Sequence, residues 1–360
     1  MDGKLDTNRV FTAEGAPNIA LIKYWGKRDE KLILPQNSSI SLTLSRDTLH
    51  TTTSVLVSSK LDEDRFYLDG EIQDLKDKDV AERFGIVGIM RKMAGIREKV
   101  LIVSRNDFPT ASGMASSASG IATLVYVLNE AFGLGLSTRK LSIVARQGSG
   151  SACRSLFGGL VEWKRGAEPD GSDSYAEQVF DEKHWPELMD NIAIVSQEKK
   201  KVPSRAGMKQ TVQSNPLYAS RPAAAEKRLS ELTEVYGKKD FESLAELIMA
   251  DSNEMHALML STRPSIRYLN RSSYKVMDLI EGLNLSEGKN IAAYTFDAGP
   301  NAHIITLSKH NAKVMEALEQ LKASGDVFDV RQSKIGQGPS MLGKDFSLID
   351  DAALGPKAGN

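Results

Sequence analysis

Residues 107–120 read Asp-Phe-Pro-Thr-Ala-Ser-Gly-Met-Ala-Ser-Ser-Ala-Ser-Gly, a dense run of small side chains. The pattern predicts an apolar strand before this run, over residues 100–103, and an apolar helix after it, over residues 121–128. Gly and Ser in such density are poor helix formers, and their small side chains let an anion approach the backbone. Successive N–H groups at a helix start, together with the helix dipole, favour phosphate. The segment therefore predicts a phosphate-binding loop.

The same segment allows other interpretations. No lysine follows its glycines, so it is not the Gly-x-x-x-x-Gly-Lys-Ser/Thr phosphate loop. The hydroxyls of Ser112, Ser116, Ser117 and Ser119 are candidates for contacts with phosphate oxygens or a metal. The structural alternative is a Ser/Ala helix packed closely on a sheet.

Composition excludes several classes of function. The 360 residues carry a net charge of −1, which leaves no basic field for nucleic acid or an anionic membrane. No apolar run approaches the ~20 residues of a membrane span, and the polar N-terminus lacks a signal-peptide core. Cys153 is the single cysteine and the five histidines are scattered, so neither a disulfide nor a Cys/His metal site is expected. We expect a soluble cytoplasmic protein.

The distribution of elements predicts an α+β fold of two lobes. Strict alternation over residues 39–45 is typical of a half-buried strand, and Asp69-Gly70 indicates a hairpin turn. We place a strand-rich lobe at 1–190 and a second lobe at 191–360, with a polar tail from about 340. The other expected strands are 50–58, 65–68, 160–163, 191–196, 291–296, 303–307 and 327–330, and the expected helices are 80–90, a helix capped by Ser137 or Thr138, 203–285 and 311–323.

Two further motifs combine cations with glycine or serine. Residues 16–27 read Ala-Pro-Asn-Ile-Ala-Leu-Ile-Lys-Tyr-Trp-Gly-Lys, which places Lys23 and Lys27 four residues apart. Residues 148–155 read Gly-Ser-Gly-Ser-Ala-Cys-Arg-Ser, a second Gly/Ser turn that contains Arg154. Ammonium, guanidinium and hydroxyl groups suit a diphosphate or a carboxylate. The alternatives are solvated lysines at a strand end and a helix cap with a surface arginine.

The second half of the chain offers a carboxylate and a charged segment. Residues 296–301 read Phe-Asp-Ala-Gly-Pro-Asn, so Asp297 stands at a strand end before a forced turn. Asp297 is a candidate general base or a group that orients a hydroxyl, and the alternative is an Asx turn. Residues 199–208 form either a lid over an anionic substrate or a solvated face. Cys153 has no paired histidine in the sequence and is expected to be a packing residue.

Together these motifs resemble one family, the diphosphomevalonate decarboxylases of the GHMP kinase superfamily. The Lys-Tyr-Trp-Gly-Lys and Gly-Ser-Gly-Ser-Ala-Cys-Arg-Ser blocks are specific to that family, whereas the Ser-rich loop marks only the superfamily. Residues 335–354, with Gly-Gln-Gly-Pro and Ser-Leu-Ile-Asp, are similar to the eukaryotic members. The matching segments span most of the chain: 16–27, 35–44, 108–120, 148–163, Gly207-Met208, Met255-His256 and 294–301.

The resemblance implies a two-lobed GHMP kinase fold, with a ferredoxin-like α/β sandwich as the C-terminal lobe. It implies ATP- and Mg²⁺-dependent decarboxylation of mevalonate 5-diphosphate to isopentenyl diphosphate, CO₂, ADP and phosphate, through a 3-phosphorylated intermediate. This reaction belongs to the mevalonate pathway of isoprenoid and sterol biosynthesis. The resemblance further implies a homodimer and an active cleft between the lobes.

The resemblance also assigns site residues by position. The implied catalytic group is Lys23, Arg154 and Asp297. The implied substrate-binding residues are Tyr24, Lys27, Ser149, Ser151, Arg154, Ser204, Arg205 and Met208. The implied ATP-binding residues are Asn106, Gly113, Ala115, Ser116, Ser117 and Ser119, with Asn106 near the adenine. No residue is assigned to Mg²⁺, because no carboxylate lies inside the Ser-rich loop.

One position departs from the family pattern. The family usually has Val-Ser-Ser before the arginine, whereas this chain has Pro203 before Ser204, which stiffens the loop.

Two alternative functions stay open. The first alternative is a related enzyme that acts as a mevalonate 3-kinase or decarboxylates the monophosphate. The second is a non-catalytic nucleotide-binding protein on the same fold. The presence of all three residues of the catalytic group argues against both.

Overall fold

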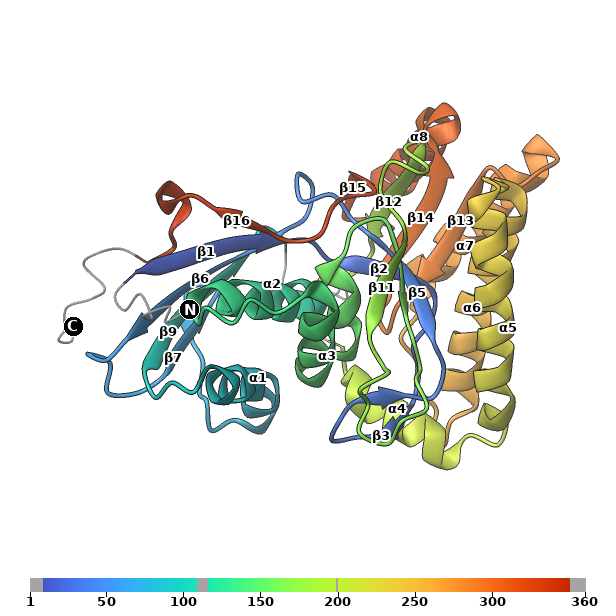
Figure 1. Cartoon of the computed structure of the whole chain (residues 1–360). Coiled ribbons are helices and arrows are strands. Elements are labelled where there is room, and N and C mark those ends of the chain that lie inside the picture. The colour runs from blue at the N-terminus through green and yellow to red at the C-terminus, as the bar shows by residue number, and fades with distance from the viewer. Residues whose placement is uncertain (1–8, 109–115, 199, 350–360) are drawn as a thin grey trace.

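The structure, a computed structural model, describes residues 9–108, 116–198 and 200–349. Within these residues the chain forms one six-stranded sheet, two four-stranded sheets and a small ribbon of β3 (Lys27–Asp29) and β4 (Leu34–Pro35) (Figure 1). The elements follow the α+β pattern predicted from the sequence. Their arrangement brings segments from both halves of the chain around one cavity.

The six-stranded sheet has the order β16-β1-β6-β9-β7-β8. Between β7 and β8, Asp69 and Gly70 have φ values of 51° and 88°, the conformation of the predicted two-residue hairpin turn. The bounds are β1 Val10–Gly15, β6 Thr51–Ser58, β7 Arg65–Leu68, β8 Glu71–Ile72, β9 Lys99–Asn106 and β16 Ser340–Leu342.

Helices α1 (Lys78–Ala94) and α2 (Ser116–Ala131) lie on one face of this sheet, and α3 (Thr138–Gly148) packs against both of them. Their apolar side chains pack on the inward-facing residues of the strands, such as Val55 and Ile102. The predicted cap of α3 is confirmed, because the Ser137 side chain accepts a hydrogen bond from the Lys140 N–H. Helix α2 begins directly after the Ser/Gly-rich segment, most of which lies outside the described residues.

The middle sheet has the order β11-β10-β5-β2, formed by β2 Asn18–Ile22, β5 Ser39–Thr43, β10 Leu160–Trp163 and β11 Ala176–Phe180. The sequence predicted β5 as a half-buried strand, but all five of its residues are buried. Its apolar side chains Ile40 and Leu42 enter the core. The hydroxyls of Ser39 and Ser41 accept hydrogen bonds from Arg154. The polar face of β5 is therefore covered by a buried cation and not by water.

The third sheet has the order β13-β14-β12-β15, formed by β12 Leu188–Ile194, β13 Ala292–Phe296, β14 Ala302–Leu307 and β15 Asp329–Lys334. Helices α7 (Arg271–Glu287) and α8 (Ser308–Ala323) pack on one face. Helices α5 (Arg221–Gly237) and α6 (Phe241–Ser261) pack on the other. Because α5 and α6 also contact the middle sheet, one apolar core joins the two sheets (Figure 1).

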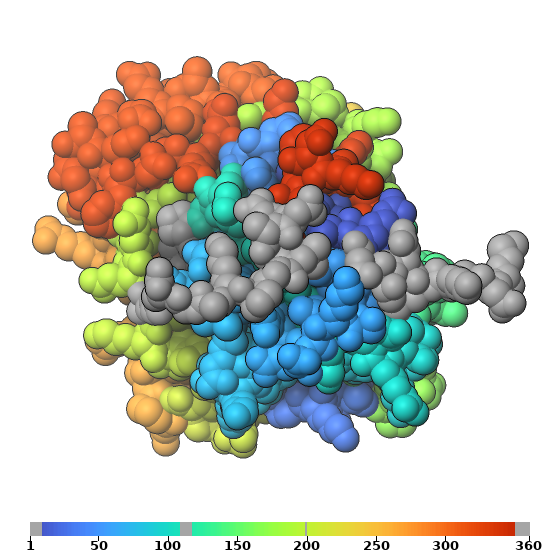
Figure 2. All heavy atoms as spheres, turned by 90° about the vertical axis from the view of Figure 1, so that its left-hand side faces the viewer, coloured from blue at the N-terminus to red at the C-terminus, as the bar shows by residue number. Residues whose placement is uncertain are grey.

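The structure corrects the expectation that the residues from about 340 form a polar tail of the second lobe. After β15, residues Ser340–Leu342 form β16, which pairs with β1 at the edge of the first sheet. The red end of the chain accordingly lies beside dark-blue residues in Figure 2. Farther on, Ile349 packs against Leu56 and Leu101 on the face opposite the helices. Sequence reasoning missed this strand because three residues carry little periodicity and their partner lies at the other end of the chain.

Candidate active site

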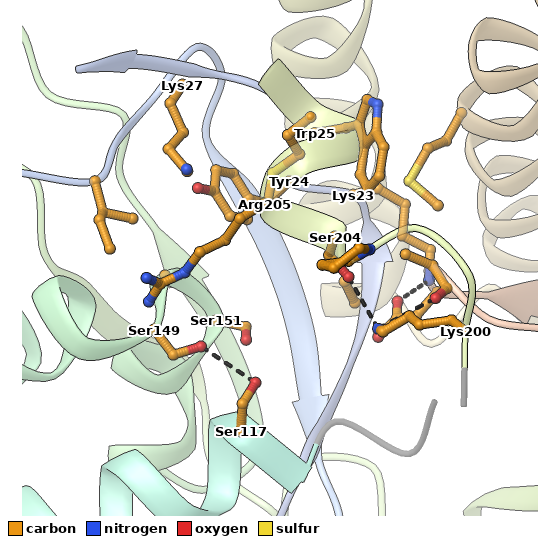
Figure 3. A pocket seen from close by; sticks show the side chains of 18 of the residues that line it. Lys23, Tyr24, Trp25, Lys27, Ser117, Ser149, Ser151, Lys200, Ser204 and Arg205 are labelled. Carbon is orange, nitrogen blue, oxygen red and sulfur yellow. Dashed lines mark hydrogen bonds and ion pairs between the residues drawn. The ribbon is translucent and has the colours of Figure 1, made fainter. Parts of the chain in front are cut away.

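A cavity of about 290 Å³ lies where β2, the short 3₁₀ helix η1 (Gly150–Leu156), α4 (Ser204–Ser214) and the turn after β13 meet (Figure 3). All three residues of the expected catalytic group line it. The expected substrate-binding residues line it as well: Tyr24, Lys27, Ser149, Ser151, Arg154, Ser204, Arg205 and Met208. The fold therefore gathers motifs that are up to 274 residues apart in the chain.

Lys23 and Asp297 form an ion pair in this cavity. Lys23 follows the fully buried strand β2 and Asp297 follows β13, and their Nζ and Oδ1 atoms are 2.8 Å apart. Burial lowers the pKa of Lys23, and the opposing effect of Asp297 offsets only part of that shift. Burial alone would raise the pKa of Asp297, but the charge and hydrogen bond of Lys23, together with the charges of His303 and Arg154, outweigh it and hold the pKa below its usual range. Asp297 is therefore ionised at neutral pH.

Arg154 is a buried cation held by neutral groups. Its guanidinium donates to Ser39 Oγ at 2.5 Å, Ser41 Oγ at 2.9 Å and Asn18 Oδ1 at 3.3 Å. Among the described residues no carboxylate forms an ion pair with it, although Arg154 is only 2% exposed. Burial lowers its pKa, as expected for a charge that lacks a counterion. A buried guanidinium in this state is suited to an anionic ligand.

Tyr24 offers a polar group to the cavity. Its hydroxyl is buried and has no hydrogen-bond partner in the part of the chain that the structure describes. The ring packs edge-on against Trp163, with centroids 4.6 Å apart. Nearby, Cys153 is fully buried and burial raises the pKa of its thiol to about 12. This environment supports the expectation that Cys153 is a packing residue and not a nucleophile.

Two further cations of the cavity are paired with glutamates. Lys27 Nζ lies 2.5 Å from Glu30, and Arg205 lies 2.5 Å from Glu82. Both glutamate side chains are substantially exposed, at 51% and 42%. Solvent therefore screens these pairs, and either carboxylate can give way to a competing anion. We call Lys27 and Arg205 the glutamate-paired cations.

Lys200 and Pro203, in the segment before α4, also line the cavity, and the lid interpretation of residues 199–208 stays a prediction. Lys200 donates to Ser204 Oγ at 2.9 Å and to the Ala298 carbonyl beside Asp297 (Figure 3). Burial lowers the pKa of Lys200, and the charge of Asp297 acts in the opposite direction. Pro203 stands immediately before α4 with φ −58° and ψ 141°, so it delimits the helix without removing Ser204 from the cavity.

The expected ATP-binding residues differ in where the structure places them. Ser117 lines the cavity, with its Oγ 3.4 Å from Ser149 Oγ. Ser119 is fully buried, and its hydroxyl bonds to Thr51 at 2.7 Å. Asn106 is not among the cavity residues, and its amide donates to Asp69. Gly113 and Ala115 lie outside the described residues, and for Ser116 the structure describes only its place at the start of α2.

Sequence reasoning missed Asp79 and Arg83, which line the cavity from the first turns of α1. Burial lowers the pKa of Arg83, and the neighbouring Arg205 lowers it further. The only local signal is their spacing of four residues, which places them on one helix face. That spacing is common on solvated helices, so nothing in the sequence singles them out.

The donor set of the cavity suits phosphate and carboxylate groups. Its described lining combines six cationic side chains (Lys23, Lys27, Arg83, Arg154, Lys200 and Arg205) with serine hydroxyls and the carboxylates of Asp79 and Asp297. No cluster of three or more His, Cys, Asp or Glu side chains suited to a metal ion occurs in the described residues. Likewise, no described helix is long and apolar enough to cross a membrane. The fold and the cavity define the class: a two-lobed α+β protein of GHMP type, built around a site for a small anionic molecule.

Comparisons with known proteins narrow this class. Residues 15–176 match the diphosphomevalonate decarboxylase-like N-terminal domain, and residues 191–340 match the mevalonate 5-diphosphate decarboxylase C-terminal domain. The chain is similar to human diphosphomevalonate decarboxylase, with 44% identity over 97% of this chain and 93% of the relative. The chain belongs to the diphosphomevalonate decarboxylase family.

Solved structures agree with that membership. Mevalonate diphosphate decarboxylase from Trypanosoma brucei superposes with a TM-score of 0.85 at 33% identity, over 95% of this chain and all of that one. The structure of MDDEF in complex with MVAPP, AMPPCP and magnesium superposes with a TM-score of 0.83 at 35% identity, over 92% and 98% of the two chains. The fold is thus shared with MDDEF in its complex with MVAPP, AMPPCP and magnesium.

Proposed function

We propose that this protein catalyses the ATP-dependent decarboxylation of mevalonate 5-diphosphate in the mevalonate pathway. The products are isopentenyl diphosphate, CO₂, ADP and phosphate. Membership of the diphosphomevalonate decarboxylase family supports this reaction. The observation that carries it is the joint presence in one cavity of the Lys23–Asp297 ion pair and the buried guanidinium of Arg154, which forms no ion pair within the described part of the chain.

The proposed roles follow from the charges. The C3 hydroxyl of the substrate is tertiary and a poor leaving group, and transfer of the γ-phosphoryl group from ATP turns it into a good one. Because its pKa is lowered, the Asp297 carboxylate is a weak base, so its best-supported role is to orient that hydroxyl. The Lys23 ammonium neutralises charge on the transferred group, since phosphoryl transfer depends mainly on positioning and charge neutralisation.

The second half of the reaction needs a fixed carboxylate. When phosphate leaves C3, cationic character develops there, and the carbon–carbon bond to the carboxylate supplies the electrons of the new double bond as CO₂ departs. Arg154 is assigned to that carboxylate because it is buried and charged, and forms no ion pair with a carboxylate of the described residues. The glutamate-paired cations are assigned to the remote diphosphate, whose binding energy can orient the reacting end.

The residues present fit a magnesium ion that enters with the nucleotide. Mg²⁺ usually keeps several waters and binds through substrate phosphates and one or two protein oxygens, so it needs no protein cage. Ser117 and Ser149, whose hydroxyls lie 3.4 Å apart at the cavity wall, would hold it. When bound, the ion neutralises phosphate charge.

The test is to measure ADP and CO₂ together from the purified protein with mevalonate 5-diphosphate, with mevalonate and mevalonate 5-phosphate as comparison substrates. We expect ADP and CO₂ in equal amounts from the diphosphate, and much lower kcat/KM for mevalonate. ADP with a stable 3-phosphorylated product and no CO₂ would instead identify a 3-kinase. Preference for the monophosphate would identify a phosphomevalonate decarboxylase, and nucleotide binding without turnover would identify a non-catalytic protein.

The same proposal includes a cytoplasmic homodimer, divided into lobes at about residue 190. The gap between the two matched domain models, residues 177–190, supports that boundary. Light scattering of the purified chain measures the mass, for which a dimer is twice 39.4 kDa. Cell fractionation tests the location.

A further inference from the structure

Through two consecutive residues, helix α6 contacts Lys23 and Phe296, the residue before Asp297. The Asp251 carboxylate accepts the backbone N–H of Lys23 at 2.7 Å. The Ser252 hydroxyl accepts the backbone N–H of Phe296, the residue before Asp297, at 3.0 Å. Both side chains are fully buried. One dipeptide thus contacts the end of β2 and the end of β13, which belong to different sheets.

Asp251 is itself immobilised by two arginines of α5. Arg221 contacts both carboxylate oxygens, at 2.7 and 3.0 Å, and Arg228 donates to Oδ1 at 2.6 Å. Arg221 also donates to the Lys23 carbonyl at 3.2 Å, so both backbone polar groups of Lys23 are held by the Asp251–Arg221 pair. Arg221 and Asp251 are both completely buried. Such a fixed pair acts as a rigid anchor for the backbone.

We propose that Asp251 and Ser252 are positioning residues, which set the distance between the Lys23 ammonium and the Asp297 carboxylate. This inference rests on the proposed function, because that function assigns the two groups to phosphoryl transfer. Neither α6 residue touches the reacting atoms; each acts through the backbone of its partner. A misplacement of about 1 Å between reacting groups can cost about 10²-fold in rate, so loss of the anchor is expected to lower kcat.

Ser252→Ala removes the hydroxyl that accepts the Phe296 N–H and makes the smallest change in volume. We expect kcat to fall about tenfold, while KM for mevalonate 5-diphosphate stays within about twofold, because positioning affects the transition state more than ground-state binding. The matched control is Ser142→Ala. Ser142 is an equally buried helix serine that accepts a strand N–H, from Ala176 at 3.1 Å, but it does not line the cavity.

Asp251→Asn provides a second measurement, the pH profile of kcat/KM. A purely structural role of Asp251 would leave that profile unchanged. Within the described residues, the charged or titratable groups that act on the Lys23 ammonium are Asp297 after β13, Asp251 and His256 on α6, and Arg154 on η1. The charge of Asp251 raises the pKa of Lys23, so its removal lowers that pKa. Activity is lost as pH rises and the ammonium loses its proton, so the basic limb of the kcat/KM profile shifts to lower pH.

Asp64→Asn is the matched control for the carboxylate. Asp64 also accepts a strand N–H, from Val100 at 3.0 Å, and a hydrogen bond from Arg91 at 2.6 Å, but it lies in the loop just before β7 and does not line the cavity. We expect both control variants to keep wild-type kcat and pH profile after their thermal unfolding has been compared with that of the test variants.

The possible results distinguish failure of the proposed function from failure of the positioning role. Absence of CO₂ release from the wild-type protein overturns the proposed function. An active wild type, with Ser252→Ala matching Ser142→Ala in kcat, overturns the positioning role alone. An unmoved basic limb in folded Asp251→Asn removes Asp251 from the proposal, and if that variant does not fold, Ser252→Ala decides by itself.

Discussion

The catalytic group and the glutamate-paired cations hold positive charge in the same cavity by different means. Arg154 is surrounded by two serine hydroxyls and an amide oxygen, and Lys23 contacts an aspartate that belongs to the site. Lys27 and Arg205 are each neutralised by a glutamate whose side chain is about half exposed. The first arrangement keeps the positive charge of Arg154 available, whereas the second keeps the charges of Lys27 and Arg205 compensated until a ligand enters.

The difference has an energetic consequence. A buried charge without a counterion is costly. An anionic ligand that pairs with Arg154 therefore offsets part of the cost of burying its charge. Both side chains of the Arg205–Glu82 pair are partly exposed. Such an ion pair contributes about 0–1 kcal/mol, so exchanging this glutamate for a diphosphate costs little. We therefore expect substitutions in the catalytic group to lower turnover strongly, and substitutions around the glutamate-paired cations to change affinity moderately.

Asp297→Asn is expected to have the largest effect. The amide is nearly isosteric but lacks the charge that orients the C3 hydroxyl and holds the Lys23 ammonium. We expect kcat to fall by about 10²–10⁴-fold, with KM within a few-fold. ADP and CO₂ release should vanish together, which a single-turnover experiment measures. Asp329→Asn, at an exposed strand end, is the control. Normal phosphorylation without CO₂ release would move Asp297 to the second step, and near-normal turnover would leave it a turn residue.

Arg154→Lys should have the next largest effect. Lysine keeps the charge but lacks the planar fork that reaches Ser39, Ser41 and Asn18 together. We expect kcat/KM to fall about 10- to 100-fold, the scale of one or two charge-assisted hydrogen bonds. Arg146→Lys is the matched control, because Arg146 is equally buried but binds the carbonyls of Gly171 and Ser174 away from the cavity. Equal losses in the two variants would mean that Arg154 has only a structural role.

Arg205→Ala should affect affinity more than turnover. It removes one of the two glutamate-paired cations, together with a hydrogen bond to the Gly148 carbonyl. We expect KM for mevalonate 5-diphosphate to rise on the order of tenfold, with kcat within a few-fold, as for one charged hydrogen bond. Steady-state kinetics measure both constants, and Lys275→Ala removes a similarly exposed ion-paired cation elsewhere as a control. A large fall in kcat at unchanged KM would erase the proposed distinction between the two regions.

Glu82→Gln should have the smallest effect, and in the opposite direction. The substitution removes the counterion of Arg205, so the substrate no longer displaces a carboxylate. We expect KM to fall by about two- to threefold, within the range of a partly exposed ion pair, and the change should shrink at high salt. Glu287→Gln, whose carboxylate pairs with Lys313, is the control. An increase in KM would show that Glu82 holds Arg205 in its binding position.

Much of the fold was predictable because it depends on local pattern. The Asp69-Gly70 turn, the strand at 160–163 and the Ser137 cap all follow from short-range preferences, and all three are confirmed. The motif segments at residues 16–27 and 148–155 were chosen for their residue types, and they meet at one cavity. These features were recoverable since a few neighbouring residues are enough to define them.

Other features depend on contacts between residues that are far apart in the sequence, and no local pattern predicts such contacts. Ser117 and Ser119 are two residues apart in the same motif, yet one lines the cavity and the other is buried against Thr51. Such a difference comes from the rotation of α2 on its sheet, and the sequence pattern of the motif does not contain it. The polar face of β5 had the pattern of a solvated surface, and only the burial of Arg154 behind it shows otherwise.

The sequence by itself determined which chemical groups this protein offers, and in which short segments: two lysines, an arginine, an aspartate and clusters of serine. The tertiary structure decided which charges are paired and which stay available for a ligand. It also decided that Asp251, 228 residues from Lys23, holds the backbone of that residue. The reason is physical: residue type and spacing act over a few neighbours, whereas burial and ion pairing depend on which distant segments share the same low-dielectric space.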